Sequence, residues 1–90
     1  MSNLSIANRL LEVCNEYEEG NLTLEGLQSN IWSHGSAMEG LGKEWEELLN
    51  SLDSESELIL YMENPNKHYI LGLNVSKRLR EHLEQRLENL

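Results

Sequence analysis

The 90-residue chain contains one cysteine, one proline and no phenylalanine. The single thiol, Cys14, cannot form an internal disulfide, and small extracellular domains usually depend on such bonds. No basic segment followed by an apolar run marks a secretory signal, and no apolar stretch approaches the roughly 20 residues that a membrane span requires. We therefore expect a cytoplasmic protein that does not contact a membrane.

Patterns that carry catalysis or metal binding are also missing. The three histidines are dispersed, Asp53 is the only aspartate, and no glycine pattern matches a phosphate-binding loop. Cys14 lies beside an apolar helical stripe, and its neighbours Val13 and Asn15 supply no cation that would stabilise a thiolate. We expect no metal, no cofactor and no enzymatic activity, so that any function depends on binding another macromolecule.

Basic residues are scarce and unevenly distributed. The net charge is −9, and residues 1–63 hold 13 acidic side chains against two basic ones, whereas residues 64–90 hold five basic side chains against three acidic ones. An acidic body repels phosphate backbones, which argues against direct nucleic-acid binding and favours a basic protein partner. We expect the carboxylates of the first two-thirds to form a coherent negative surface.

Leucine-rich periodicity predicts a single all-α domain, residues 1–90, formed by a small bundle of four to five helices. The first helix begins at Ser5 and ends before Gly20, whose backbone freedom is typical of a helix stop. Thr23 is a good N-cap for a short second helix that ends near Gly35. Both helices have one apolar face.

Two more helices are expected after Gly35. Residues 36–39 match a capping box and predict the start of a third helix, which includes Trp45 in its apolar stripe. Asn74 or Ser76 is expected to cap the last helix. Its apolar stripe consists of Val75, Leu79, Leu83, Leu87 and Leu90.

The segment between these helices is ambiguous. Residues 58–62 and 69–73 are short apolar runs that flank the turn-rich residues 64–67. Runs of this length suit buried strands, so a short β-hairpin within 58–73 is the alternative to helix, turn and helix. A second capping-box pattern at residues 54–57 favours the helix.

Two acidic rows and one tryptophan are the candidate partner-binding residues. Like charges repeated along a helix destabilise the fold and can steer a basic partner. Trp32 lies about 100° around its helix from Ile31 and is expected to be partly exposed, whereas Trp45 is expected in the core. The candidates are Glu12, Glu16, Glu19, Trp32, Glu44, Glu46 and Glu47.

The chain resembles the small helical immunity proteins that bacteria make against their own secreted nuclease toxins, such as the colicin D immunity and MafI-type groups. The resemblance consists of an acidic chain of about this length, an amphipathic opening helix and the turn Gly20-Asn21-Leu22-Thr23 into a short second helix. It implies one-to-one binding of a basic toxin domain, with carboxylates taking the place of nucleic-acid phosphates.

Two other functions remain open. The first is a structural or regulatory helical module that forms a homodimer through the stripe from Val75 to Leu90. The second is a DNA-mimicking antagonist of a DNA-binding protein, which would use the same acidic character against a different target. The sequence leaves open whether the chain is a monomer or a homodimer.

Overall fold

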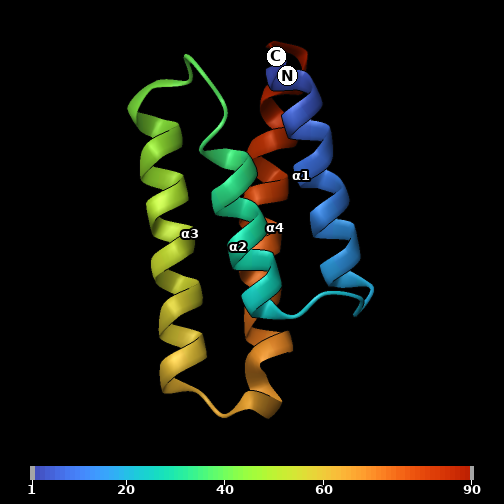
Figure 1. Ribbon diagram of the computed structural model, residues 1–90, viewed down its shortest axis with the longest axis vertical. Helices are drawn as coiled ribbons and strands as arrows, with labels where there is room; N and C mark the ends of the chain where they lie inside the picture. Colours follow the sequence, from blue (N-terminus) through green and yellow to red (C-terminus); the bar gives the residue numbers. More distant parts are fainter. Residues whose placement is uncertain (1, 90) are drawn as a thin grey trace.

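The computed structural model describes residues 2–89 and contains four α-helices in this range (Figure 1). The 3₁₀ turns η1 and η2 follow α3 and α4. The elements are α1 (Asn3–Glu18), α2 (Leu24–Gly35), α3 (Gly42–Met62), η1 (Pro65–Lys67), α4 (His68–Arg86) and η2 (Leu87–Asn89). The all-α prediction is confirmed, and a fifth α-helix is not found within these residues.

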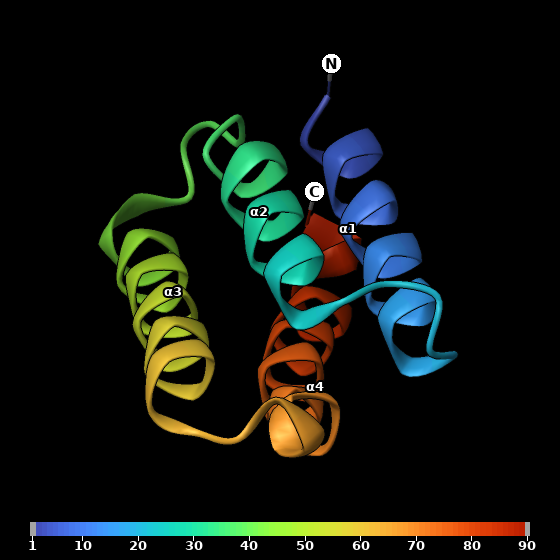
Figure 2. The same ribbon diagram turned by 60° about the horizontal axis from the view of Figure 1, so that its bottom comes forward.

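The helices run alternately up and down around one core (Figures 1 and 2). Helix α1 packs against α2 and α4, and α3 packs against the same two helices. The helices α1 and α3 therefore lie at opposite sides of the bundle. Side chains on the outer surfaces of α1 and α3 consequently face in different directions.

The first two helix boundaries follow from local hydrogen bonds. The Ser2 hydroxyl accepts a hydrogen bond from the Ser5 amide, so α1 begins at Asn3, two residues before the predicted start. Gly20 has a φ of 82°, a backbone conformation that favours glycine and stops α1 from continuing. The Thr23 hydroxyl accepts from the Gly26 amide at 3.0 Å, which confirms the predicted N-cap of α2.

The start of the third helix differs from the prediction. Residues 36–41 form a loop, and α3 begins at Gly42 rather than at the capping box of residues 36–39. Gly40 and Gly42 have φ values of 73° and 75°, a conformation that interrupts a helix. The Asn3 side chain holds this loop through hydrogen bonds with the Glu39 backbone carbonyl (2.7 Å) and amide (3.0 Å).

The β-hairpin alternative for residues 58–73 is wrong, because this segment is the end of α3, the turn η1 and the start of α4. Pro65 occupies the first position of η1, and the Asn64 side chain accepts from the Asn66 amide, so the turn joins two helices. The capping-box pattern at 54–57 lies inside α3, where the Ser56 hydroxyl donates to the Leu52 carbonyl. Helix α4 begins six residues before Asn74.

The apolar stripe of α4 lies inside the bundle. Val75, Leu79 and Leu83 are buried in one cluster with Trp45 and Cys14. The expected core positions of Trp45 and Cys14 are confirmed. Leu90, the last residue assigned to this stripe, lies outside the described residues. Dimerisation through Val75, Leu79 and Leu83 would therefore require the core to open. None of the helices in residues 2–89 has the length and apolar character needed to span a bilayer.

Candidate binding surface

Three arginines of α4 pair with carboxylates on the neighbouring helices. Arg78 contacts Glu55 at 2.6 Å and Arg86 contacts Glu44 at 2.5 Å, and both carboxylates belong to α3. Arg80 contacts Glu18 of α1 at 2.8 Å. Most of the positive charge of the C-terminal third thus joins α4 to α1 and α3.

The contact between α1 and α4 contains the largest polar network. The Arg80 guanidinium donates to both oxygens of Glu18 and to the Asn15 side chain, and the Ser76 hydroxyl donates to Glu18 at 2.6 Å. The buried Cys14 thiol donates to the Ser76 carbonyl, and burial raises the pKa of this thiol. Cys14 is thus enclosed in the core at this contact.

The upper contact between α3 and α4 includes Glu44, one of the predicted binding residues. The Arg86 guanidinium beside Glu44 lowers the pKa of this carboxyl. Nearby, the rings of Trp45 and His82 lie 5.7 Å apart, and the Trp45 indole donates to the Gly35 carbonyl at 2.9 Å. Burial and the neighbouring Arg86 lower the pKa of His82. Glu44 thus already has a cationic partner within the fold.

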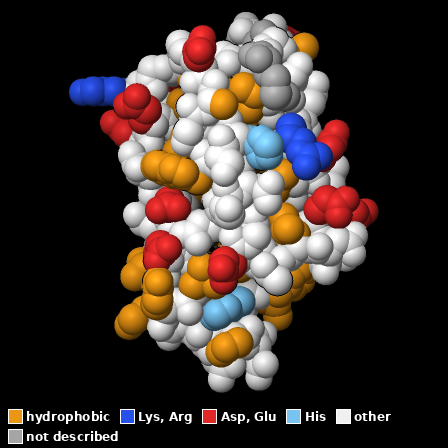
Figure 3. All heavy atoms as spheres, in the orientation of Figure 1, with side chains coloured by type: hydrophobic (Ala, Val, Ile, Leu, Met, Phe, Trp, Pro, Cys, Tyr) orange, Lys and Arg blue, Asp and Glu red, His pale blue; other side chains and the backbone are white. Residues whose placement is uncertain are grey.

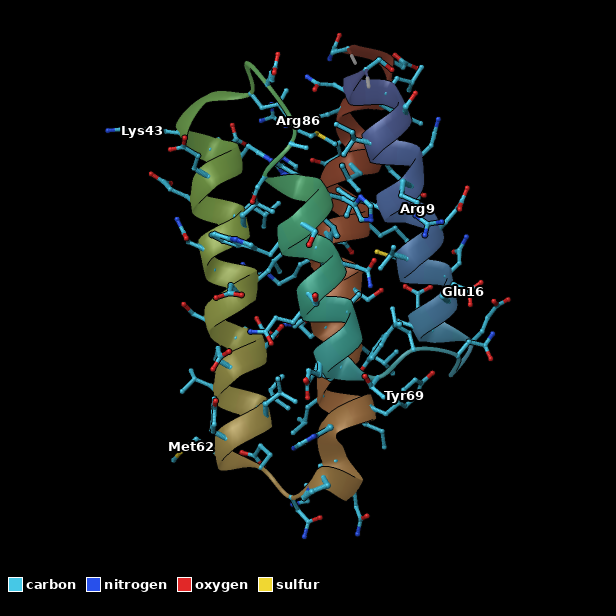
Figure 4. All side chains as sticks on the ribbon, in the orientation of Figure 1. Arg9, Glu16, Lys43, Met62, Tyr69 and Arg86 are labelled. Carbon is cyan, nitrogen blue, oxygen red and sulfur yellow. The ribbon has the colours of Figure 1, made fainter. Side chains whose placement is uncertain are left out.

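The acidic row of α1 lies on the outer edge of the bundle. Glu12 pairs with Arg9 at 3.2 Å, and both side chains are more than half exposed. Glu16 and Glu19 are also exposed. Figure 4 shows Arg9 and Glu16 pointing outward from α1, on the side away from α3. The structure therefore does not bring this row together with Glu44, Glu46 and Glu47.

Trp32 and Glu46 are the two predicted residues that the structure does bring together. They line one shallow hollow between α2 and α3, together with Asn50. Trp32 is 46% exposed, in agreement with the expected partial exposure. On its other side Trp32 borders Asp53. Glu47 is exposed on α3 but does not line these hollows.

These contacts define a surface that we call the α2–α3 face, formed by Glu25, Trp32, Glu46, Asp53 and Glu57. The three α3 carboxylates lie at intervals of seven and four residues, so they follow one side of the helix over about 16 Å. Among residues 2–89, none of the four carboxylates of this face forms an ion pair with lysine or arginine. Figure 3 shows acidic groups distributed over this side, with basic groups only near its upper corners.

Gln28 holds two of these carboxylates in place. Its side-chain amide donates to Glu57 at 2.9 Å and to Asp53 at 3.2 Å, which links α2 to α3 across the face. An amide supplies hydrogen bonds without neutralising charge. The carboxylates are therefore positioned by the fold while their charge remains uncompensated.

An apolar groove continues the face at its lower end. The groove has a volume of about 930 Å³. Tyr17, Leu22, Leu60, Tyr61, Pro65 and Tyr69 form most of its apolar lining, and Glu25 and Glu57 belong to both the groove and the face. Figure 3 shows apolar side chains gathered around the lower end of the molecule. A partner that covers the face therefore also reaches the groove.

Tyr17 lies fully buried beneath the groove. Its hydroxyl donates to the backbone carbonyls of Tyr69 (2.8 Å) and His68 (3.2 Å), and burial raises the pKa of Tyr17 to about 12. The Tyr69 hydroxyl donates in return to the Glu18 carbonyl. A Cβ at Gly72 would lie 2.1 Å from the Tyr17 hydroxyl oxygen, so glycine permits this close approach of α4 to α1.

Sequence reasoning did not identify Glu25, Asp53 and Glu57, nor the tyrosines of the groove. Asp53 and Glu57 share the helical register of Glu46, but only the packing of α2 against α3 places Asp53 beside Trp32 and both carboxylates beside Gln28. Within the described chain, no three His, Cys, Asp or Glu side chains converge in a way that could hold a metal ion.

Comparison of the chain with protein-family models, curated proteins and solved structures finds no match. The geometry of the surface is therefore the basis for the functional proposal.

Proposed function

We propose that this protein is a non-catalytic binding inhibitor of the immunity type, which occludes the active site of a basic nuclease toxin through the α2–α3 face. The observation that carries the proposal is the half-exposed Trp32 flanked by the uncompensated carboxylates of Glu46 and Asp53. The arginines of α4, by contrast, are paired within the fold. Four carboxylates without a cationic partner in the described part of the chain thus lie on one face, where a cationic surface can meet them.

The physical basis is electrostatic complementarity with one aromatic anchor. A nuclease binds phosphates with lysine and arginine, and carboxylates held at the positions of phosphates compete for the same groups. A coherent field of one sign raises association rates by roughly 10 to 10³-fold. Tryptophan is enriched among the residues that dominate binding energy, which suits the central position of Trp32.

The proposal places the chain in the cytoplasm, where it needs no cofactor and acts by one-to-one binding. The homodimer alternative loses support, because most of the α4 stripe is part of the core. The DNA-mimicking alternative shares the acidic surface and differs in its target. The identity of the captured partner, nuclease or DNA-binding regulator, separates these two functions.

The test is affinity capture from the source organism followed by an activity assay. The bait is the full chain, compared with the variant Trp32→Ala/Asp53→Asn/Glu57→Gln, which alters three residues of the face. We expect the native chain to retain a basic nuclease at one-to-one stoichiometry and to abolish its cleavage of RNA or DNA. The variant should retain much less of this nuclease.

A matched control changes the same number of side chains on α1, as Glu12→Gln/Glu16→Gln/Glu19→Gln. This control should capture the nuclease as well as the native chain. Equal capture by the native chain and the face variant, or a bound nuclease that still cleaves, would contradict the proposal. A captured regulator without nuclease activity would favour the DNA-mimicking function instead.

A further inference from the structure

We propose that the apolar groove below the α2–α3 face receives a short amphipathic segment of the basic partner, with apolar side chains inside the groove and lysine or arginine against Glu25 and Glu57. This inference rests on the proposed function, because it describes where that partner inserts. The groove is a separate feature from Trp32 and can be tested on its own.

The lining of the groove suits apolar side chains. Tyr61 at its edge is 81% exposed, and Tyr69 is 40% exposed, although tyrosine rings usually contribute their large apolar area to a core or an interface. A volume of about 930 Å³ is large enough for several side chains. An exposed apolar surface of this kind, rimmed by polar groups, is typical of an interaction site.

The floor of the groove is rigid, which favours binding. Two tyrosine hydroxyls join α1 to α4: Tyr17 bonds to the backbone of the first turn of α4, and Tyr69 bonds to the backbone at the end of α1. Gly72 lets Tyr17 lie directly against α4. A pre-formed groove loses little conformational entropy when it is filled.

Charge selects the kind of segment. Glu25 and Glu57 are the acidic side chains that line the groove. His68 also lines it, and its ring lies 3.0 Å from the Glu63 carbonyl oxygen. No lysine or arginine of the described chain lines it. An apolar segment that carries carboxylates would be repelled, whereas one that carries lysine or arginine gains two ionic contacts.

A second apolar hollow lies between α3 and α4, and one of its two glutamates is paired with an arginine. It is lined by Leu58, Met62 and Leu71, with Glu55 and Glu63 beside them. Glu55 already pairs with Arg78, and none of the five residues of the α2–α3 face lines this hollow. Met62 is 75% exposed, so it offers a matched control for Tyr61.

The experiment uses two designed helical peptides as probes of the full chain. Both carry leucines on one face at the i, i+3, i+4 and i+7 positions, and one has lysines on the flanks where the other has glutamates. Binding is measured by calorimetry, and the site is located by amide chemical shifts. We expect the lysine peptide to bind and to shift residues 20–25, 57–61 and 65–69. Tyr61→Ala should weaken binding roughly tenfold, and Glu25→Gln/Glu57→Gln should remove the preference for lysine.

Met62→Ala should leave binding of the lysine peptide unchanged. Equal affinity for both peptides, or shifts at the second hollow, would overturn the inference. Sedimentation and vesicle flotation complete the test. Self-association that Tyr61→Ala abolishes would assign the groove to a second copy of the chain. Binding to neutral phosphatidylcholine vesicles would assign it to a lipid surface. A nuclease that is captured and inhibited equally well by Tyr61→Ala would refute the groove inference and leave the proposed function intact.

Discussion

The contact between α4 and its neighbours and the α2–α3 face use charge in opposite ways. In the first region each of three arginines has a carboxylate partner. Arg80 donates hydrogen bonds to both Glu18 and Asn15. In the second region, Gln28 positions Asp53 and Glu57 without neutralising them. Paired charges hold the bundle together, whereas the unpaired ones increase its self-repulsion. This difference is the observation on which the proposed binding role of the face rests.

The largest change in stability is expected at the contact between α1 and α4, from Gly72→Ala. The new methyl group would meet the Tyr17 hydroxyl and the Leu24 side chain, and overpacking of this kind costs about 1–3 kcal/mol, which exceeds the gain in helix propensity. Urea unfolding followed by circular dichroism measures the loss. Gly26→Ala is the control, because its methyl group meets the mobile end of Leu22 and should cost little. Equal stability of the two variants would show that the close approach at Gly72 is unimportant.

A smaller loss is expected from Arg80→Met in the same contact. The substitution removes hydrogen bonds to Glu18 and Asn15 from a partly exposed site, and we expect a loss of about 1 kcal/mol in the free energy of unfolding. Arg9→Met breaks only the exposed pair with Glu12 and should change stability by less than ~0.5 kcal/mol. Similar losses in both variants would mean that the α1–α4 network adds nothing beyond a surface ion pair.

The contact between α3 and α4 predicts a dependence of stability on pH. The folded state lowers the pKa of His82, so the unfolded chain takes up a proton first as the pH falls. Stability should therefore be fully present above the ordinary histidine pKa of 6.5 and decrease below it. Urea midpoints at pH 7.5 and 5.5 test this, and His82→Gln should reduce the difference. If the urea midpoints of His82→Gln differ between the two pH values as much as those of the native chain, groups other than His82 cause the pH dependence.

The smallest effect on stability is expected at the face itself. The variant Glu46→Gln/Asp53→Asn/Glu57→Gln keeps oxygen acceptors for Gln28 and reduces self-repulsion. We expect the free energy of unfolding to stay within ~0.5 kcal/mol of the native value, or to rise. Thermal unfolding at low salt is the measurement. A substantial loss would show that these carboxylates stabilise the fold, contrary to the comparison above.

The parts of the fold that depend on local interactions could be predicted from the sequence. Gly20 and Thr23 mark the first chain reversal through their own backbone preferences and hydrogen bonds. The capping-box pattern of residues 36–39 misled because Gly40 and Gly42 adopt helix-breaking conformations after it. The apolar runs around η1 resembled buried strands, but much of their apolar surface is exposed, in part around the groove and the second hollow.

The candidate surface was less predictable, because it depends on which helices become neighbours. The exposure of Trp32 could be expected from its position beside Ile31, but the hollows that it shares with Glu46 and Asp53 result from the packing of α2 on α3. The excess of acidic residues among the first 63 also combined carboxylates that pair with arginines of α4 and carboxylates that do not. Glu18, Glu44 and Glu55 neutralise α4, which periodicity within a single helix cannot reveal.

The most direct test of the account compares association rates of two variants with the captured nuclease by stopped flow, at low and at high salt. Glu46→Gln/Asp53→Asn/Glu57→Gln and Glu12→Gln/Glu16→Gln/Glu19→Gln change the net charge equally, so they differ only in the surface that they alter. We expect the first to slow association roughly tenfold at low salt and the second to change it less than about twofold, with the difference reduced at high salt. Equal rates for the two variants would contradict the assignment of binding to the α2–α3 face.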